Sequence, residues 1–96
     1  MTVRERIRSK RREIDTIAKR YGVTSIRLFG SVARGDDRPE SDIDLLIEVE
    51  PGRGLLDHAG FTIEMQKLLG VHVDVVTKGG LKDRLRDHVL SEAVSL

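Results

Sequence analysis

The chain has 96 residues, of which 34% are charged, and the charges nearly cancel to a formal net charge of +1. At this length we expect a single domain over residues 1–96, too small to include a separate substrate-binding domain. The near-neutral balance favours neither binding nor avoidance of nucleic acid. There is no cysteine, which excludes disulfides and thiolate metal sites. Because no apolar run could span a membrane and no signal-peptide core is present, we expect a cytoplasmic protein.

Hydrophobic periodicity predicts a helix over residues 3–21, ended by a glycine at position 22. Its apolar positions recur at the spacing of one helix face: Val3, Ile7, Ile14, Ile17 and Tyr21. The alternating residues 25–29 predict a strand that ends at Gly30. Residues 31–34 favour a short helix, and a turn-rich stretch follows.

The second half of the chain predicts a strand over residues 41–49, a helix over 55–69 and a strand over 71–77. A final helix is predicted from Leu81 onward, with one apolar stripe formed by Leu81, Leu85, Val89 and Ala93. The predicted order is α-β-α-β-α-β-α. The expected fold class is α/β (α+β), with a three-stranded sheet flanked by helices.

Three carboxylates fall inside predicted strands, where solvated turns would be the usual place for them. Asp42 and Asp44 are two residues apart, so both side chains point to the same face of a strand. Carboxylates held side by side repel each other unless cations neutralise them. Mg²⁺ is commonly held by one or two carboxylates together with substrate phosphates. Asp74, among the valines of the later strand, would complete a triad if the two strands are neighbours.

An anion-binding element is predicted just upstream, where the first strand passes into the short helix. Gly30 permits close backbone approach, and Ser31 can cap a helix whose free amides favour an anion. Arg34 is interpreted either as a phosphate contact or as a surface charge. Together with the acids, this element predicts a site for a triphosphate and two metal ions.

Gly30-Ser31, ten intervening residues and Asp42-Ile43-Asp44 make up the pattern G-S-x10-D-x-D. Three sequence segments extend the pattern: Phe-Gly-Ser-Val-Ala-Arg-Gly-Asp over residues 29–36, Ser-Asp-Ile-Asp-Leu-Leu over 41–46, and Val-Asp-Val-Val-Thr over 73–77. In these segments the chain resembles the DNA polymerase β-like nucleotidyltransferase superfamily. It is most similar to the minimal nucleotidyltransferases encoded beside HEPN-domain proteins as toxin–antitoxin pairs.

The resemblance implies a small mixed three-stranded sheet of the polymerase β-like fold and a role for each residue of the pattern. Gly30 and Ser31 would contact the β- and γ-phosphates of ATP, with Arg34 as a further candidate for nucleotide binding. Asp42 and Asp44 would hold two Mg²⁺ ions. Asp74 would bind the catalytic ion and help to deprotonate the acceptor hydroxyl.

The resemblance also implies the reaction and the partner. The chain would transfer AMP from ATP to a hydroxyl, expected to be a tyrosine, of a cognate HEPN toxin with which it forms a hetero-oligomer. It would thus be the antitoxin of a type VII-like toxin–antitoxin system. The alternatives are a non-catalytic antitoxin that acts by binding, and a transferase acting on a small molecule or nucleic acid. Nucleic acid is not the expected partner, because the chain has only three aromatic residues and so no stacking platform.

Two further groups of residues are interpreted as structural. His58, His72 and His88 lack the spacing of metal ligands and are expected at surface or boundary positions. The helix over 55–69 carries apolar residues on more than one face. Most of them are expected in the core, and the surplus could contact a partner.

Overall fold

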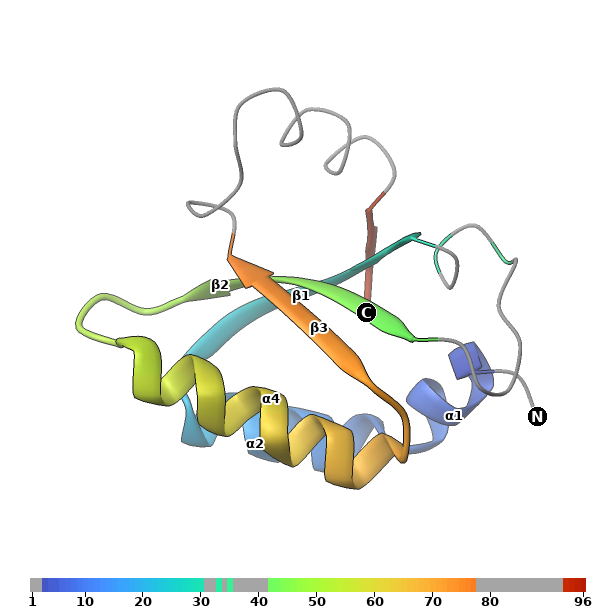
Figure 1. Ribbon diagram of the computed structural model, residues 1–96, viewed down its shortest axis with the longest axis horizontal. Helices are drawn as coiled ribbons and strands as arrows, with labels where there is room; N and C mark the ends of the chain where they lie inside the picture. The colour runs from blue at the N-terminus through green and yellow to red at the C-terminus, as the bar shows by residue number, and fades with distance from the viewer. Residues whose placement is uncertain (1–2, 31–32, 34, 36–41, 78–92) are drawn as a thin grey trace.

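The computed structural model describes residues 3–30, 33, 35, 42–77 and 93–96. Figure 1 shows the arrangement of the elements and the course of the chain between them. In chain order the elements are α1 (Val3–Ser9), α2 (Arg11–Arg20), β1 (Val23–Phe29), β2 (Ile43–Val49), α4 (Leu55–Leu69), β3 (Val73–Thr77) and β4 (Val94–Ser95).

The strands form one mixed sheet in the order β3-β2-β1-β4. β1 is antiparallel to both β2 and β4, whereas β2 and β3 are parallel. A parallel pair needs a crossover connection, and α4 provides it. The prediction of three strands was wrong by one, because Ser95 and Val94 pair with Arg27 and Leu28. A strand of two residues is too short for any alternation of apolar and polar residues to reveal it.

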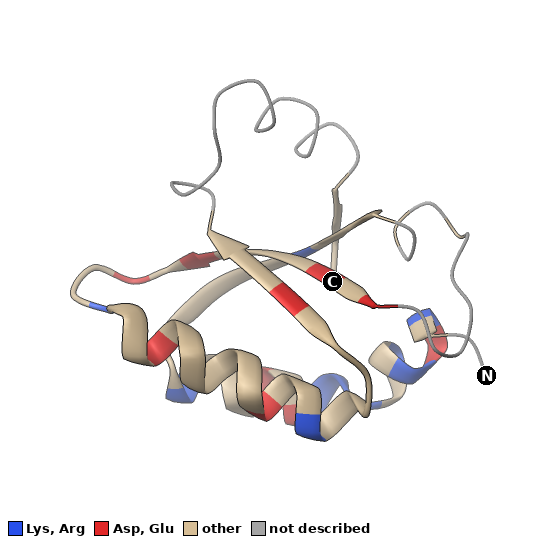
Figure 2. Cartoon of the chain, in the orientation of Figure 1, with Lys and Arg blue, Asp and Glu red and all other residues tan. Residues whose placement is uncertain are grey.

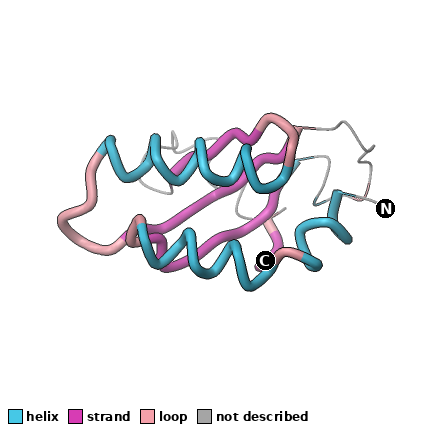
Figure 3. The backbone as a smooth tube through the Cα atoms, turned by 90° about the horizontal axis from the view of Figure 1, so that it is seen from below, coloured by secondary structure: helices cyan, strands magenta, loops and turns pink. Residues whose placement is uncertain are grey.

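α1, α2 and α4 lie on the same face of the sheet, so the fold has one helical layer and one sheet layer (Figures 1 and 3). Alternate strand residues point into the space between these layers. The core there consists of Val3, Ile7, Ile14, Ile17, Ala18, Val23, Leu28, Ile43, Leu45, Ile47, Phe61, Met65, Leu69, Val73 and Val75. This burial is the main term that holds the helices to the sheet.

The N-terminal helix predicted as continuous is two helices, with a break at Lys10. The Lys10 amide donates to the carbonyl of Ile7 at 3.2 Å, which is the bond of a tight turn, and the Ser9 hydroxyl donates to the carbonyl of Arg6 at 2.8 Å. Six polar residues separate Ile7 from Ile14. No apolar side chain anchors the middle of this segment to the core, so packing does not oppose a break there.

α4 begins and ends at the predicted residues. At its start the Gly54 amide donates to Asp57 Oδ2 at 3.0 Å, and Arg53 pairs with Asp57 at 3.2 Å and with Glu50 at 2.7 Å. The bond from the Gly54 amide, aided by Arg53, lowers the pKa of Asp57. At its end Gly70 adopts a left-handed conformation and its amide donates to Gln66, as expected of a C-terminal cap.

The remaining expectations concern short or outlying segments. The strands predicted over 25–29, 41–49 and 71–77 each differ from the observed strands by two residues at their starts. The predicted short helix, apart from Ala33, lies outside the described residues, as does the predicted final helix up to residue 92. At the end of that final helix the prediction was wrong, because Val94–Ser95 form β4. Within the described part of the chain, no helix is long and apolar enough to cross a membrane.

Candidate active site

Gly30 lies immediately after β1, in contact with an acidic side chain. Its φ angle is +74°, in the left-handed region that favours glycine. A Cβ atom built on Gly30 would collide with the carboxylate of Asp44. The position therefore requires glycine for two independent reasons, its backbone conformation and the lack of space.

Asp44 and Asp74 are directly paired positions of the parallel strands β2 and β3. The chain neighbours of Asp44, Ile43 and Leu45, are buried under the helices. Because side chains alternate along a strand, Asp44 and Asp74 both point to the face away from the helices. Neighbouring strands are separated by about 4.8 Å, so the two carboxylates are neighbours on that face. The triad predicted from the sequence depends on this pairing.

Asp42 precedes β2 and is exposed to solvent. The Ile43 amide, next in the chain, donates to the carbonyl of His72 at 2.9 Å. This bond extends the β2–β3 pairing to the residue beside Asp42. The starts of the parallel strands β2 and β3 therefore lie beside the end of β1. We call this end of the three strands the acidic edge of the sheet, and it carries Gly30 and all three acids.

His72 is a residue of this edge whose contact the sequence analysis did not anticipate. It is exposed, as expected, but its Nε2 lies 2.8 Å from Asp74 Oδ1. The hydrogen bond and the charge of Asp74 raise the pKa of His72, and the charges of Asp42 and Asp44 act in the same direction more weakly. The signal in the sequence was the spacing of His72 and Asp74, two residues apart on one strand.

The structure locates four of the six predicted site residues, since Ser31 and Arg34 lie outside the described residues. Among the described residues, no three carboxylate or imidazole side chains are gathered closely enough to form a ready metal-binding group. Mutual repulsion favours such separation of like charges, and Asp74 is held by His72.

The donor set at this edge fits Mg²⁺ and a triphosphate. Carboxylate oxygens are the ligands that Mg²⁺ takes from proteins, with the remaining positions filled by phosphate and water. The Asp44 carboxylate lies directly against the backbone of Gly30, in the place that a Cβ would take. Figure 2 shows acidic residues on β2 and β3, whereas many of the basic residues lie on α1 and α2. Three unneutralised acids attract cations and repel a bare polyanion.

The family pattern described as a nucleotidyltransferase domain matches residues 7–96. The chain therefore belongs to the nucleotidyltransferase family, and it is an enzyme of that family. A candidate minimal nucleotidyltransferase of known structure is 47% identical, with a TM-score of 0.86 over 100% of this chain and 97% of that chain. Its similarity confirms the fold class.

Two relatives are named for protein modification. A candidate protein adenylyltransferase of Methanocaldococcus jannaschii is 38% identical over 90% of this chain and 92% of its own length. The protein adenylyltransferase MntA of Thermococcus cleftensis is 37% identical over 81% of this chain and 79% of its own. A toxin–antitoxin structure with AMP-PNP shares the fold, with a TM-score of 0.73 and 20% identity over 88% of this chain and 69% of that chain.

Proposed function

We propose that this chain is a cytoplasmic protein adenylyltransferase that transfers AMP from ATP to a hydroxyl, expected to be a tyrosine, of a HEPN-domain toxin, and thereby acts as its antitoxin. The observation that carries the proposal is the in-register pairing of Asp44 with Asp74 beside Gly30. This arrangement sets neighbouring carboxylates, which can hold metal ions, beside a glycine whose backbone a phosphate can approach closely.

The relatives support the choice of a protein acceptor. Those that cover most of this chain are named protein adenylyltransferases, and structural neighbours at TM-scores of 0.73 and 0.72 are toxin–antitoxin complexes. A chain of 96 residues has little room for a second domain that would enclose a small acceptor. An acceptor that supplies its own folded surface suits a site of this size.

In the proposed complex, Asp42 and Asp44 would hold two Mg²⁺ ions, and Asp74 would hold one of them. Bound Mg²⁺ supplies positive charge that offsets the charge of the triphosphate and orients it. Gly30 lets the backbone approach the phosphates, and Ser31 and Arg34 are the further candidates for contact with them. The contribution of these residues is position and electrostatic stabilisation.

The proposed transfer is a single displacement at the α-phosphorus of ATP. The acceptor hydroxyl oxygen forms the new bond to phosphorus while Asp74 helps to remove its proton, which passes on to solvent. The bond between the α-phosphorus and the bridging oxygen breaks, and pyrophosphate leaves with that electron pair. His72, which touches Asp74 and not the reacting atoms, positions that carboxylate.

The decisive experiment measures the intact mass of the purified toxin after incubation with this chain, ATP and Mg²⁺. The expected result is a gain in AMP-sized steps, with catalytic amounts of this chain silencing an excess of toxin. The control is the Asp42→Asn/Asp44→Asn double variant, which should leave the toxin mass unchanged. Full protection of cells with an unchanged toxin mass would refute the proposal and assign inhibition to binding alone.

A further inference from the structure

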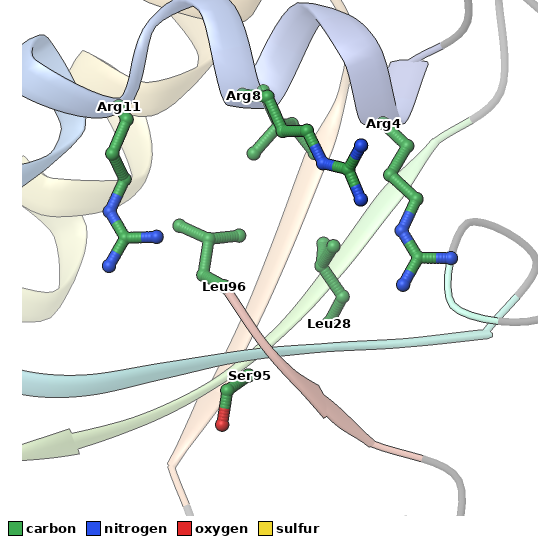
Figure 4. Close-up of a pocket in the computed structure, with 7 residues that line it drawn as sticks. Arg4, Arg8, Arg11, Leu28, Ser95 and Leu96 are labelled. Carbon is green, nitrogen blue, oxygen red and sulfur yellow. The ribbon is translucent and has the colours of Figure 1, made fainter.

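A cavity of about 150 Å³ lies between α1, the start of α2 and the β1–β4 edge of the sheet. Three arginines border it from the helices, Arg4, Arg8 and Arg11. The rest of its lining is Ser95 and three apolar residues, Ile7, Leu28 and Leu96. Figure 4 shows Arg11 and Arg4 on either side of Leu96 and Leu28, with Arg8 above these two leucines. The cavity therefore combines a cationic rim with an apolar floor.

These arginines are largely unused by the fold. In the described part of the chain, neither Arg4 nor Arg8 has a carboxylate within ion-pair distance, and Arg11 pairs only with the exposed Asp15 at 3.3 Å. Arg6, on the same helix, instead donates to the carbonyl of Leu69 at 2.9 Å and so links α1 to the end of α4. Repulsion among three neighbouring cations costs stability, which an anionic occupant would relieve.

The basic residues of the whole chain are also concentrated in the segment that contains these arginines. Eight of its 17 lysine and arginine residues but only three of its 16 aspartate and glutamate residues lie in the first 20 positions. A chain that is almost neutral overall thus presents a basic N-terminal segment. Such separation steers partners of opposite charge toward one face.

A second cavity of about 130 Å³ continues the first, since Arg11 and Leu96 line both. Its remaining lining includes Asp15, Thr24 and Ser25, and it is therefore more polar. We call the two cavities together the arginine groove. Two adjoining cavities of this size suit a peptide segment better than an isolated ion.

The size and lining of the groove decide between kinds of anion. A cavity near 150 Å³ holds a group about as large as benzene, and therefore one aliphatic side chain. Among the described residues that line the two cavities none is aromatic, so these residues offer the bases of a nucleic acid no surface for stacking. Carboxylates beside an aliphatic side chain match both parts of the groove, because guanidinium groups bind carboxylates in a two-pronged geometry.

We propose that the arginine groove docks an acidic, amphipathic segment of the toxin, with one aliphatic side chain in the Leu28–Leu96 cavity and carboxylates on Arg4 and Arg8. The inference rests on the proposed function, because the docked protein is the one that is adenylylated. Leu28 is two residues from Gly30 but faces the helices, whereas Asp44 faces the opposite side. The groove therefore holds the acceptor protein without occupying the site of transfer.

The test compares Arg4→Glu/Arg8→Glu with Arg12→Glu/Lys19→Glu, which makes the same change of charge at exposed positions of α2 outside the groove. Toxin concentration is varied at saturating ATP, and adenylylation is followed by intact mass. We expect the groove variant to raise the KM for toxin by at least about tenfold and to keep the KM for ATP. The control variant should stay within about twofold of wild type. Equal effects of both variants, or none, would overturn the proposal.

Direct binding separates this proposal from the proposed function. Toxin binding is measured by calorimetry without ATP, and circular dichroism checks that each variant is folded. Binding that the groove variant loses and the control keeps supports docking, even if wild type adds no mass to the toxin and the transferase proposal fails. A labelled 12-nucleotide RNA that binds wild type but not the groove variant would overturn the proposal in favour of nucleic acid. A groove-dependent dimer without toxin would overturn it in favour of self-association.

Discussion

Gly30 and Asp44 meet across the end of the β1–β2 pair with no space for a side chain between them. The antiparallel register that pairs Phe29 with Asp44 fixes this approach. The proposed phosphate-binding segment and a proposed metal-binding acid are thus joined by backbone pairing, and a change at either residue acts on the other.

Gly30→Ala should therefore reduce transfer by at least about tenfold, since the new methyl group displaces the Asp44 carboxylate. It should also cost about 1–2 kcal/mol of unfolding free energy, because alanine is strained at positive φ. Gly70→Ala is the matched control, with a φ of +72° but open space around the added Cβ. It should lose similar stability and keep its activity. Equal activity of the two variants would show that the triphosphate does not approach Gly30.

Asp42→Asn, Asp44→Asn and Asp74→Asn should each lower the transfer rate by at least about a hundredfold, the scale of losing one electrostatic contact in a transition state. The melting temperature should be unchanged or higher, because each substitution relieves repulsion between acids. Glu48→Gln, which removes an exposed charge farther along β2, is the control and should retain activity. Near wild-type rates in the aspartate variants would rule out the proposed site.

Stability should decline in acid through Asp57. The pKa of this group is lowered from 3.8 by the Gly54 amide and Arg53. Its contribution is therefore complete above pH 3.8 and is lost as the pH falls through the lower value in the folded state. Urea unfolding of wild type and Asp57→Asn between pH 7 and pH 2.5 measures this. The stability advantage of wild type should shrink toward the acid end, and a constant difference would contradict the assignment.

Two apolar residues of α4 should differ sharply in their contribution to stability. Phe61 is fully buried, whereas Leu56 is 88% exposed. Phe61→Ala should lower the free energy of unfolding by about 3–5 kcal/mol, and Leu56→Ala should change it by less than about 0.5 kcal/mol. Chemical denaturation measures both. A large loss in Leu56→Ala would indicate that this residue is covered in solution.

The sequence predicts best the features that depend on local pattern. α4 was predicted residue for residue, because Gly54 and Gly70 stand immediately before and after it. Asp42 and Asp44 share a face because strand geometry alternates. The same local reasoning failed at Lys10, where six polar residues conceal a break between two helices.

Features that depend on contacts between distant segments needed the structure. The pairing of Asp44 with Asp74 follows from the parallel alignment of β2 and β3. The sequence of neither strand alone predicts that alignment. The resemblance to known nucleotidyltransferases supplied what local pattern could not, by assigning Asp74 to the site. Neither the local sequence pattern nor the family resemblance indicated β4. They also did not indicate that Arg4, Arg8 and Leu96 line one cavity.

The direction of β2 has a practical consequence. The strand leads away from Asp44 for several residues before the turn at Pro51, which is therefore on the order of 15–20 Å from the acids at the rise of a strand. Pro51 is exposed, and the chain has no cysteine of its own. A single Pro51→Cys substitution would thus give one uniquely reactive thiol for a fluorescent dye. Such a labelled protein could report toxin association in real time, with the dye at the far end of the sheet from the reaction.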